Sequence, residues 1–231
     1  MPGRAIIAPV SFGDTTLPKI DITYVAPLAG ALYDFAVDQL PLGPVASWAS
    51  LVDGVPIVAD GSTTPTVMTD GATKMVRFNG TIDRMKVTTN LATARTIVAV
   101  ARLRAPVALD QIFYGASTSN EGAIGVPSGA TNYAGYGGGS TLSLSPAVVP
   151  DANWHVFILT HAGTSSAVRV DNTETTGNLP LATQATLTLG FGPAADFRSE
   201  IDYKRVAILA GGTTTAQRGA IVAQLKAQYG I

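Results

Sequence analysis

The sequence contains no cysteine. This absence excludes disulfide bonds, thiolate catalysis and the cysteine-based zinc and iron–sulfur sites. The 231 residues include only two histidines, His155 and His161, so a structural zinc site is not expected either. The two histidines lie six residues apart, which is roughly 20 Å along a strand, too far to share one metal ion. We interpret them as hydrogen-bonding residues of the fold.

Charged residues are scarce as well. They make up 13% of the chain, about half the roughly 25% of an average protein. Fifteen Lys and Arg nearly balance sixteen Asp and Glu, for a net charge of −1. Because no basic block is present to neutralise phosphates, nucleic acid is not expected as a partner. Much of the surface must be Thr, Ser, Gly and Ala, which suits a chain covered by neighbours or exposed to a harsh exterior.

Long apolar runs are also missing. No stretch approaches the roughly 20 residues that a membrane span needs, so membrane insertion is not expected. The chain starts with MPGRAIIAPVSF, and Pro9 stands where the apolar stretch of a signal peptide would continue. We therefore expect a protein that is made in the cytosol and either stays there or leaves the cell by lysis.

The chain is long enough for one substantial domain, which would bury about 70% of its unfolded surface. Residues 1–22 contain three prolines and two glycines and show neither helical nor sustained strand periodicity. They are predicted to form an extended N-terminal arm, in which Ile7, Phe12 and Leu17 could bind a neighbouring subunit. The alternative is a strand folded back on its own domain. Residues 23–231 are assigned to the globular domain.

Short apolar segments bounded by turn residues recur along this domain. Residues 95–103 form the strongest predicted strand, and we expect it to lie centrally in a sheet. Asn79-Gly80 predicts a tight turn joining the strands 74–78 and 84–87. Further strands are predicted at residues 111–115, 123–126, 141–144, 154–160, 167–170, 186–189 and 200–209. Together with the short segments at residues 23–33, 45–52 and 55–58, these make roughly a dozen strands without intervening helices, which predict an antiparallel sandwich.

One helix is predicted, at residues 215–228. Thr214 followed by Gln217 fits a capping box, and Gly230 is a natural stop. Ile221 and Leu225 are expected to face the sandwich, so that the helix closes over it.

Four segments of the second half resemble, in order, the strands of the concanavalin A-like, laminin-G-like jelly roll. Asn153–Phe157 (NWHVF) looks like the W-H-x-V strand, and Ala167–Asn172 (AVRVDN) looks like the following strand and turn. Thr188–Gly190 (TLG) and Phe197–Asp202 (FRSEID) resemble the next two strands. The resemblance implies an all-β, two-sheet jelly-roll sandwich in which Trp154 and Phe157 are buried.

Similar domains with a Pro-rich arm are familiar among bacteriophage virion proteins. The resemblance thus implies a non-enzymatic structural protein on the particle exterior, in the tail, fibre or capsid decoration. Its partners would be other virion proteins or identical subunits, and its location the virion. The alternative function is a carbohydrate-binding module that recognises host-surface glycan. Its ligand-binding residues would be Asn132, Tyr133 and Tyr136, in the Gly-rich residues 115–140. These tyrosines could instead pack back on the sandwich.

A glycosidase is the weaker alternative. Glycosidases of this fold carry Glu-x-Asp-x-x-Glu on one strand. Glu200 and Asp202 match the first two acids, but Arg205 stands at the third position, so the general acid is missing. No catalytic residue is therefore assigned.

Calcium is bound by several relatives of this fold. The oxygen ligands available in turns are Asp53, Asp60, Asp171, Asn172 and Asp196. Because they form no dense cluster, we interpret them as solvated turn residues and expect no metal or other cofactor.

Overall fold

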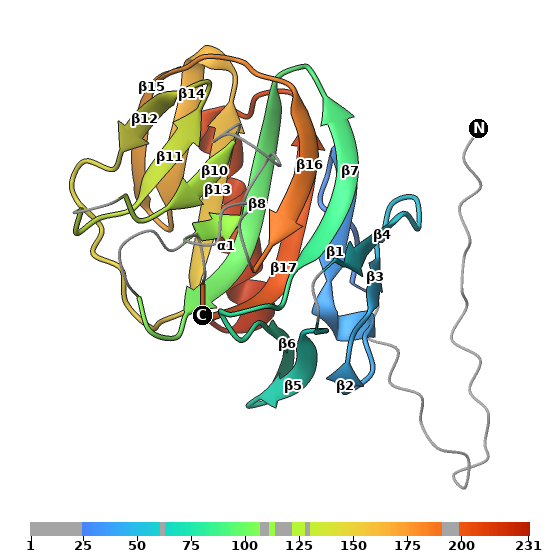
Figure 1. Ribbon diagram of the computed structural model, residues 1–231. Coiled ribbons are helices and arrows are strands. Elements are labelled where there is room, and N and C mark those ends of the chain that lie inside the picture. The colour runs from blue at the N-terminus through green and yellow to red at the C-terminus, as the bar shows by residue number, and fades with distance from the viewer. Residues whose placement is uncertain (1–24, 61–62, 107–110, 114–121, 128–129, 191–198) are drawn as a thin grey trace, which may run out of the picture.

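The computed structural model describes residues 25–60, 63–106, 111–113, 122–127, 130–190 and 199–231. The predicted arm, with Ile7, Phe12 and Leu17, lies outside the described residues. The described part of the chain is a sandwich of antiparallel sheets with one helix against it (Figure 1). This confirms the predicted all-β sandwich.

One layer is a large sheet in the order β15-β14-β13-β8-β17-β6-β5-β2, with β1 pairing beside β6 on the long strand β17. Its strands are β1 (Ala31–Ala36), β2 (Gly43–Pro44), β5 (Thr66–Asp70), β6 (Thr73–Arg77), β8 (Arg95–Leu103), β13 (His155–His161), β14 (Gly163–Val170), β15 (Thr173–Leu179) and β17 (Ile201–Ala210). β8 lies between β13 and β17, as its apolar sequence predicts.

Two smaller sheets form the opposite layer. The first, in the order β12-β11-β10-β9, contains β9 (Gln111–Phe113), β10 (Ala123–Gly125), β11 (Ala134–Gly137) and β12 (Ser140–Ser143). The second, in the order β16-β7-β4-β3, contains β3 (Ser47–Ala49), β4 (Pro56–Ala59), β7 (Met85–Leu91) and β16 (Gln184–Leu189). A short 3-10 helix, η1 (Val37–Gln39), follows β1.

The two faces of the large sheet are covered by different partners. Ile97 and Ala99 of β8 point into the main core between the layers, together with Phe157. Val98 and Val100 point the other way, into a second apolar cluster with the helix. Because both faces are covered, the middle of β8, from Ile97 to Ala101, is continuously apolar instead of alternating between apolar and polar residues.

The helix α1 (Thr215–Tyr229) lies behind the large sheet in Figure 1. Thr214 and Gln217 form the predicted capping box, and Gly230 ends the helix with a φ of 65°. Leu225 is buried against the sheet as predicted, whereas Ile221 is only partly buried. No helix in the described part of the chain is long and apolar enough to cross a membrane.

The predicted tight turn at Asn79-Gly80 is wrong. β6 and β7, which flank it, belong to different layers, since β6 pairs with β5 and β17 while β7 pairs with β4 and β16. The Asn79 side chain accepts hydrogen bonds from the backbone N–H groups of Thr81, Ile82 and Asp83. This local turn redirects the chain from one layer to the other, a role that the dipeptide alone does not distinguish from a hairpin.

The Gly-rich stretch 115–140 contains β10, which matches the strand predicted at residues 123–126, and β11, which lies where the glycines predict a loop or hairpin tip. In β11, Gly135 and Gly137 face the large sheet. A Cβ atom on Gly135 would lie 2.9 Å from Leu159 Cδ1, and one on Gly137 would lie 2.7 Å from His161 Nε2. These glycines therefore allow the two layers to approach closely.

Candidate functional site

The predicted ligand-binding residues Asn132, Tyr133 and Tyr136 do not form an accessible aromatic platform. Tyr133 is fully buried and its ring meets that of Phe157 edge-on, with centroids 5.1 Å apart. Tyr136 points to the opposite face of β11 but is only 8% exposed, and burial raises the pKa of Tyr136 to about 12. The Asn132 amide donates to the carbonyl of Leu144. The burial of both rings agrees with the alternative interpretation, in which these tyrosines pack back on the sandwich.

The acids of the glycosidase-like motif are occupied by arginines. Asp202 is fully buried and accepts hydrogen bonds from Arg77 Nε at 2.9 Å and from Arg102 Nε at 3.0 Å. Glu200 lies 3.1 Å from Arg104. At the third motif position, the guanidinium of Arg205 donates to both oxygens of buried Asp34, at 2.8 and 2.6 Å. This arrangement supports the structural interpretation of these acids.

The calcium candidates among the described residues do not converge. The carboxylate of Asp171 binds His155 and Lys226, and that of Asp60 binds Arg84. Asp53 accepts the backbone N–H of Val55 in its own turn. Asn172 follows Asp171 in the turn before β15, and Asp196 lies outside the described residues. Within the described ranges, no three His, Asp or Glu side chains are grouped to hold a metal ion.

His155 lies between two carboxylates. Its Nδ1 is 2.7 Å from Asp171 and its Nε2 is 2.9 Å from Asp151. Burial lowers the pKa of His155, but the hydrogen bonds to Asp171 and Asp151 outweigh it, so the pKa is raised above the usual value. His161, fully buried, approaches the carbonyl of Pro180 through Nε2 at 2.7 Å. Both histidines thus take structural hydrogen-bonding roles.

A different aromatic side chain, Trp154, lies at a surface groove. The sequence predicts that Trp154 is buried in the core, but it is only half-buried, whereas Phe157 is fully buried as predicted. The other tryptophan, Trp48, is the one inside the sandwich. Trp154 immediately precedes β13 and has the same strand parity as Val156, whose side chain points away from the main core. That parity is the signal in the sequence that could have placed Trp154 on the outer face.

Contacts from neighbouring strands fix the orientation of the Trp154 ring. Its Nε1–H donates to Asp70 Oδ2 across 2.8 Å. The Arg102 guanidinium and the Lys204 ammonium lie 4.6 Å and 4.4 Å from the ring centroid, a cation–π arrangement. Lys204 lies on this outer face because it alternates along β17 with Ile201 and Tyr203, whose side chains point into the main core.

The groove beside Trp154 has a volume of about 560 Å³ and lies between the β5–β6 turn and the end of α1. Its polar lining comes from Asp70, Thr73, Lys204 and Gln228, and Trp154 and Tyr229 supply aromatic surface. Burial raises the pKa of Asp70, but Arg102, Lys204 and Trp154 more than offset it and lower the pKa below the usual value. Asp70 is therefore an ionised acceptor at neutral pH.

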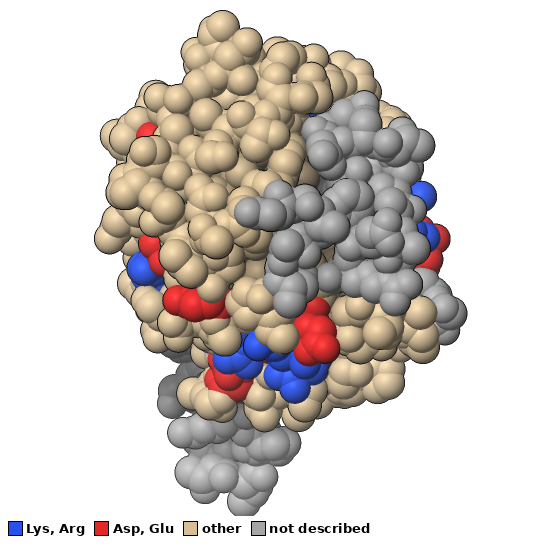
Figure 2. Space-filling view, turned by 60° about the vertical axis from the view of Figure 1, so that its left-hand side comes forward, with Lys and Arg blue, Asp and Glu red and all other residues tan. Residues whose placement is uncertain are grey.

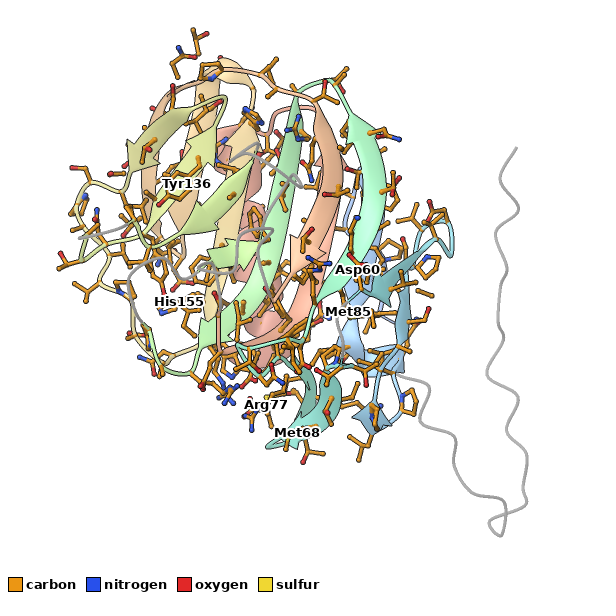
Figure 3. All side chains as sticks on the ribbon, in the orientation of Figure 1. Asp60, Met68, Arg77, Met85, Tyr136 and His155 are labelled. Atoms are coloured by element: carbon orange, nitrogen blue, oxygen red, sulfur yellow. The ribbon has the colours of Figure 1, made fainter. Side chains whose placement is uncertain are left out.

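A second groove, of about 410 Å³, lies on the same outer face. Its lining includes Thr64, Thr66, Met68, Arg77, Arg104 and Glu200. Figure 3 shows Met68 and Arg77 together at the β5–β6 end of the molecule. In Figure 2 most of the visible surface is uncharged, and acidic and basic side chains gather at its lower end.

Comparisons with known proteins show which solved structures share this fold. No family model and no curated protein sequence matches the chain. Domain 4 of AbnA, a GH43 extracellular arabinanase from Geobacillus stearothermophilus solved in complex with arabinotriose, is similar with a TM-score of 0.65 and 13% identity. The match covers 83% of this chain and 98% of that domain.

Two larger proteins contain a similar domain. A Trypanosoma rangeli sialidase matches with a TM-score of 0.65 and 12% identity, over 92% of this chain and 35% of the sialidase. The binding domain of botulinum neurotoxin DC, in complex with SialylT, matches with a TM-score of 0.59 and 10% identity, over 85% of this chain and 51% of that domain. The chain thus spans about a third of the length of the sialidase and about half of the length of the botulinum binding domain. At these identities the likeness establishes the fold alone.

Proposed function

We propose that this chain is a non-enzymatic carbohydrate-binding module and that it binds sugar in the groove beside Trp154. The observation that carries this proposal is the half-buried indole of Trp154, held in a fixed orientation at the wall of a groove of about 560 Å³ whose lining combines apolar surface with a few polar side chains. Concave sites with an aromatic surface and a few convergent polar groups are typical ligand sites.

The lining of the groove matches the chemistry of a sugar ring. An aromatic side chain packs on the C–H groups of the ring, while hydroxyl groups need both hydrogen-bond donors and acceptors. Asp70 supplies an acceptor, and the exposed Gln228 amide, whose Oε1 accepts from Arg205, supplies a donor through its NH₂ group. Because Asp70 and Lys204 already hold the indole in place, little ordering cost remains for binding.

The solved relatives support a carbohydrate as the ligand class. The arabinanase domain was solved with arabinotriose, and the botulinum binding domain with SialylT. The sialidase and the arabinanase are glycosidases, which raises the question of an enzymatic function. The burial of Asp202 beneath Arg77 and Arg102, and the pairing of Glu200 with Arg104, argue against these acids acting on a substrate. For this reason we propose binding without catalysis.

Display on a phage particle stays a prediction from the sequence. The arm on which that interpretation depends lies outside the described residues, and the solved relatives above do not test it. A carbohydrate-binding module is compatible with such a location, because a virion exterior would present it to host-surface glycans.

The proposed function is tested by screening the full chain on a glycan array and measuring the affinity of each hit by calorimetry. Trp154→Ala should weaken binding at least tenfold, and Trp154→Phe should retain most of it because an aromatic surface remains. Val149→Ala, at a 65% exposed position outside both grooves, is the matched control and should bind like the wild type. Unchanged affinity of Trp154→Ala would overturn the proposal.

A further inference from the structure

We propose that the two grooves are consecutive subsites of one binding surface and that its ligand is a neutral, linear oligosaccharide. This inference rests on the proposed function and specifies the class of carbohydrate. It follows from how the strands connect the two grooves and from the balance of charge around them.

The same strands line both grooves. On β5, Asp70 lines the groove of Trp154 and Thr66 lines the second groove. On β6, Thr73 lines the groove of Trp154 and Arg77 lines the second groove. In each pair the two residues are four positions apart on one face of the strand, which is about 13 Å along the sheet. This span exceeds a single sugar ring and suits a short oligosaccharide laid along the strands.

The surface between the two grooves is continuous and rigid. Arg102 lies between them and binds both Asp70, at 3.4 Å, and Asp202, at 3.0 Å. Asp202 in turn binds Arg77, which lines the second groove. Met68 is 38% exposed beside this ion-pair network and offers apolar surface next to its polar groups. A chain of sugars crossing this region would therefore meet a preformed surface.

The charges around the grooves cancel. Four cationic side chains face four carboxylates, namely Arg77, Arg102, Arg104 and Lys204 against Asp70, Asp83, Glu200 and Asp202. An anionic sugar would find each guanidinium already paired with a carboxylate. A neutral sugar can instead use the same groups as hydrogen-bond donors and acceptors without disturbing the ion pairs. The surface thus favours neutral over sialylated or sulfated glycans.

The experiment is calorimetric titration of the full chain with a series of neutral linear oligosaccharides of two to six units, using each sugar type that binds on the array. The second groove is altered by Thr66→Val with Glu200→Gln. These are surface changes, because Glu200 has a side chain that is 49% exposed and Thr66 is half-buried. Trp154→Ala alters the first groove. A cooperative thermal transition well above the assay temperature verifies that each variant is folded.

The expected affinity rises with length up to about four units. The second-groove variant should bind the tetrasaccharide about tenfold more weakly than the wild type, which is the effect of one or two lost hydrogen bonds. Its affinity for the disaccharide should be unchanged. Trp154→Ala should weaken both. Binding should change little between low and physiological salt, because a neutral ligand has no charge to screen.

Two sets of results would overturn this inference while leaving the proposed function intact. The first is an affinity that does not depend on the length of the oligosaccharide. The same conclusion would follow if the second-groove variant bound every oligosaccharide like the wild type, or if it weakened binding of the disaccharide as much as binding of the tetrasaccharide. The second is tighter binding of sialylated or sulfated counterparts with a steep salt dependence. Failure of every glycan to bind, or unchanged binding by Trp154→Ala, would instead overturn the proposed function itself.

Discussion

The indole N–H of Trp154 donates a hydrogen bond to Asp70 across 2.8 Å and so connects the residue before β13 to the end of β5. Arg102 of β8 and Lys204 of β17, two of the three strands that separate β13 from β5 in the sheet, lie over the same ring. The ring is thus positioned by four strands of the large sheet, which do not need to rearrange to bind a ligand. A rigid sheet that positions an aromatic side chain in this way favours a preorganised binding site.

The different burial of Trp154 and Phe157 predicts different effects on stability. Phe157→Ala removes a fully buried ring from the main core and should lower the free energy of unfolding by about 3–5 kcal/mol. Trp154→Ala should cost clearly less, because the indole is only half-buried. Urea denaturation of the two variants measures this difference. An equal or larger loss for Trp154→Ala would show that its contribution is that of a core residue.

Glu174 of β15 should make the docking of the helix sensitive to acid. It accepts hydrogen bonds from Arg218 Nε at 2.8 Å and Nη2 at 2.7 Å, and Arg218 lowers the pKa of Glu174 to about 2. Because the pKa is lower in the folded than in the unfolded chain, the stabilisation is present above about pH 4.3 and is lost as the pH falls toward about 2.

The test of this pair is Glu174→Gln. The free energy of unfolding of the variant should be about 1.5–3 kcal/mol lower than that of the wild type at neutral pH, which is the range for hydrogen bonds to charged groups. Its stability should also vary less between pH 4.5 and pH 2.5 than that of the wild type, as measured by chemical denaturation. A wild type and variant with parallel pH profiles would contradict the assignment.

His155 predicts a second pH dependence of opposite sign. The pKa of His155 is raised in the folded chain, where Asp171 and Asp151 outweigh the opposing effect of burial. Its contribution to stability is therefore complete below the ordinary histidine pKa of about 6.5 and is lost as the pH rises through the folded value. NMR titration of the His155 ring should give a pKa above that of an unstructured histidine. The free energy of unfolding of the wild type should fall between pH 6 and pH 8.5, and that of a His155→Gln variant should not show this fall. A His155 pKa below 6.5 would refute this prediction.

Removing α1 should leave the sandwich without fixed packing. The helix covers Val98, Val100, Val156 and Ile158, which belong to the apolar cluster on the outer face of the large sheet. A chain truncated after Gly212 would expose this face, and we expect it to be insoluble or to bind hydrophobic dyes without a cooperative thermal transition. A cooperative melt at the wild-type temperature would show that the helix is dispensable.

The elements that could be predicted from the sequence are those with strong local signals. β8 is predicted with its exact bounds because its apolar residues form one uninterrupted strand, and α1 is predicted from its capping box and terminal glycine. The polar strand β15, with the sequence TETTGNL, was not predicted, because it pairs at the sheet edge without an apolar pattern of its own. Its place depends on hydrogen bonds with β14.

The candidate site was largely beyond prediction for a related reason. Asp70, Arg102, Trp154 and Lys204 come from four separate segments, and only the strand order of the large sheet brings them together. The residues predicted instead, Tyr133 and Tyr136, were chosen because glycines surround them. Those glycines serve close packing between the two layers and do not open a loop.

The most direct test of the central claim uses the two tryptophans of the chain as internal probe and control. In ¹⁵N-labelled protein, each indole N–H gives its own NMR signal, one from Trp154 in the groove and one from Trp48 in the core. Titration with an oligosaccharide that binds on the array should shift the Trp154 signal to saturation and leave the Trp48 signal in place. A ligand that binds without shifting the Trp154 signal would contradict the account.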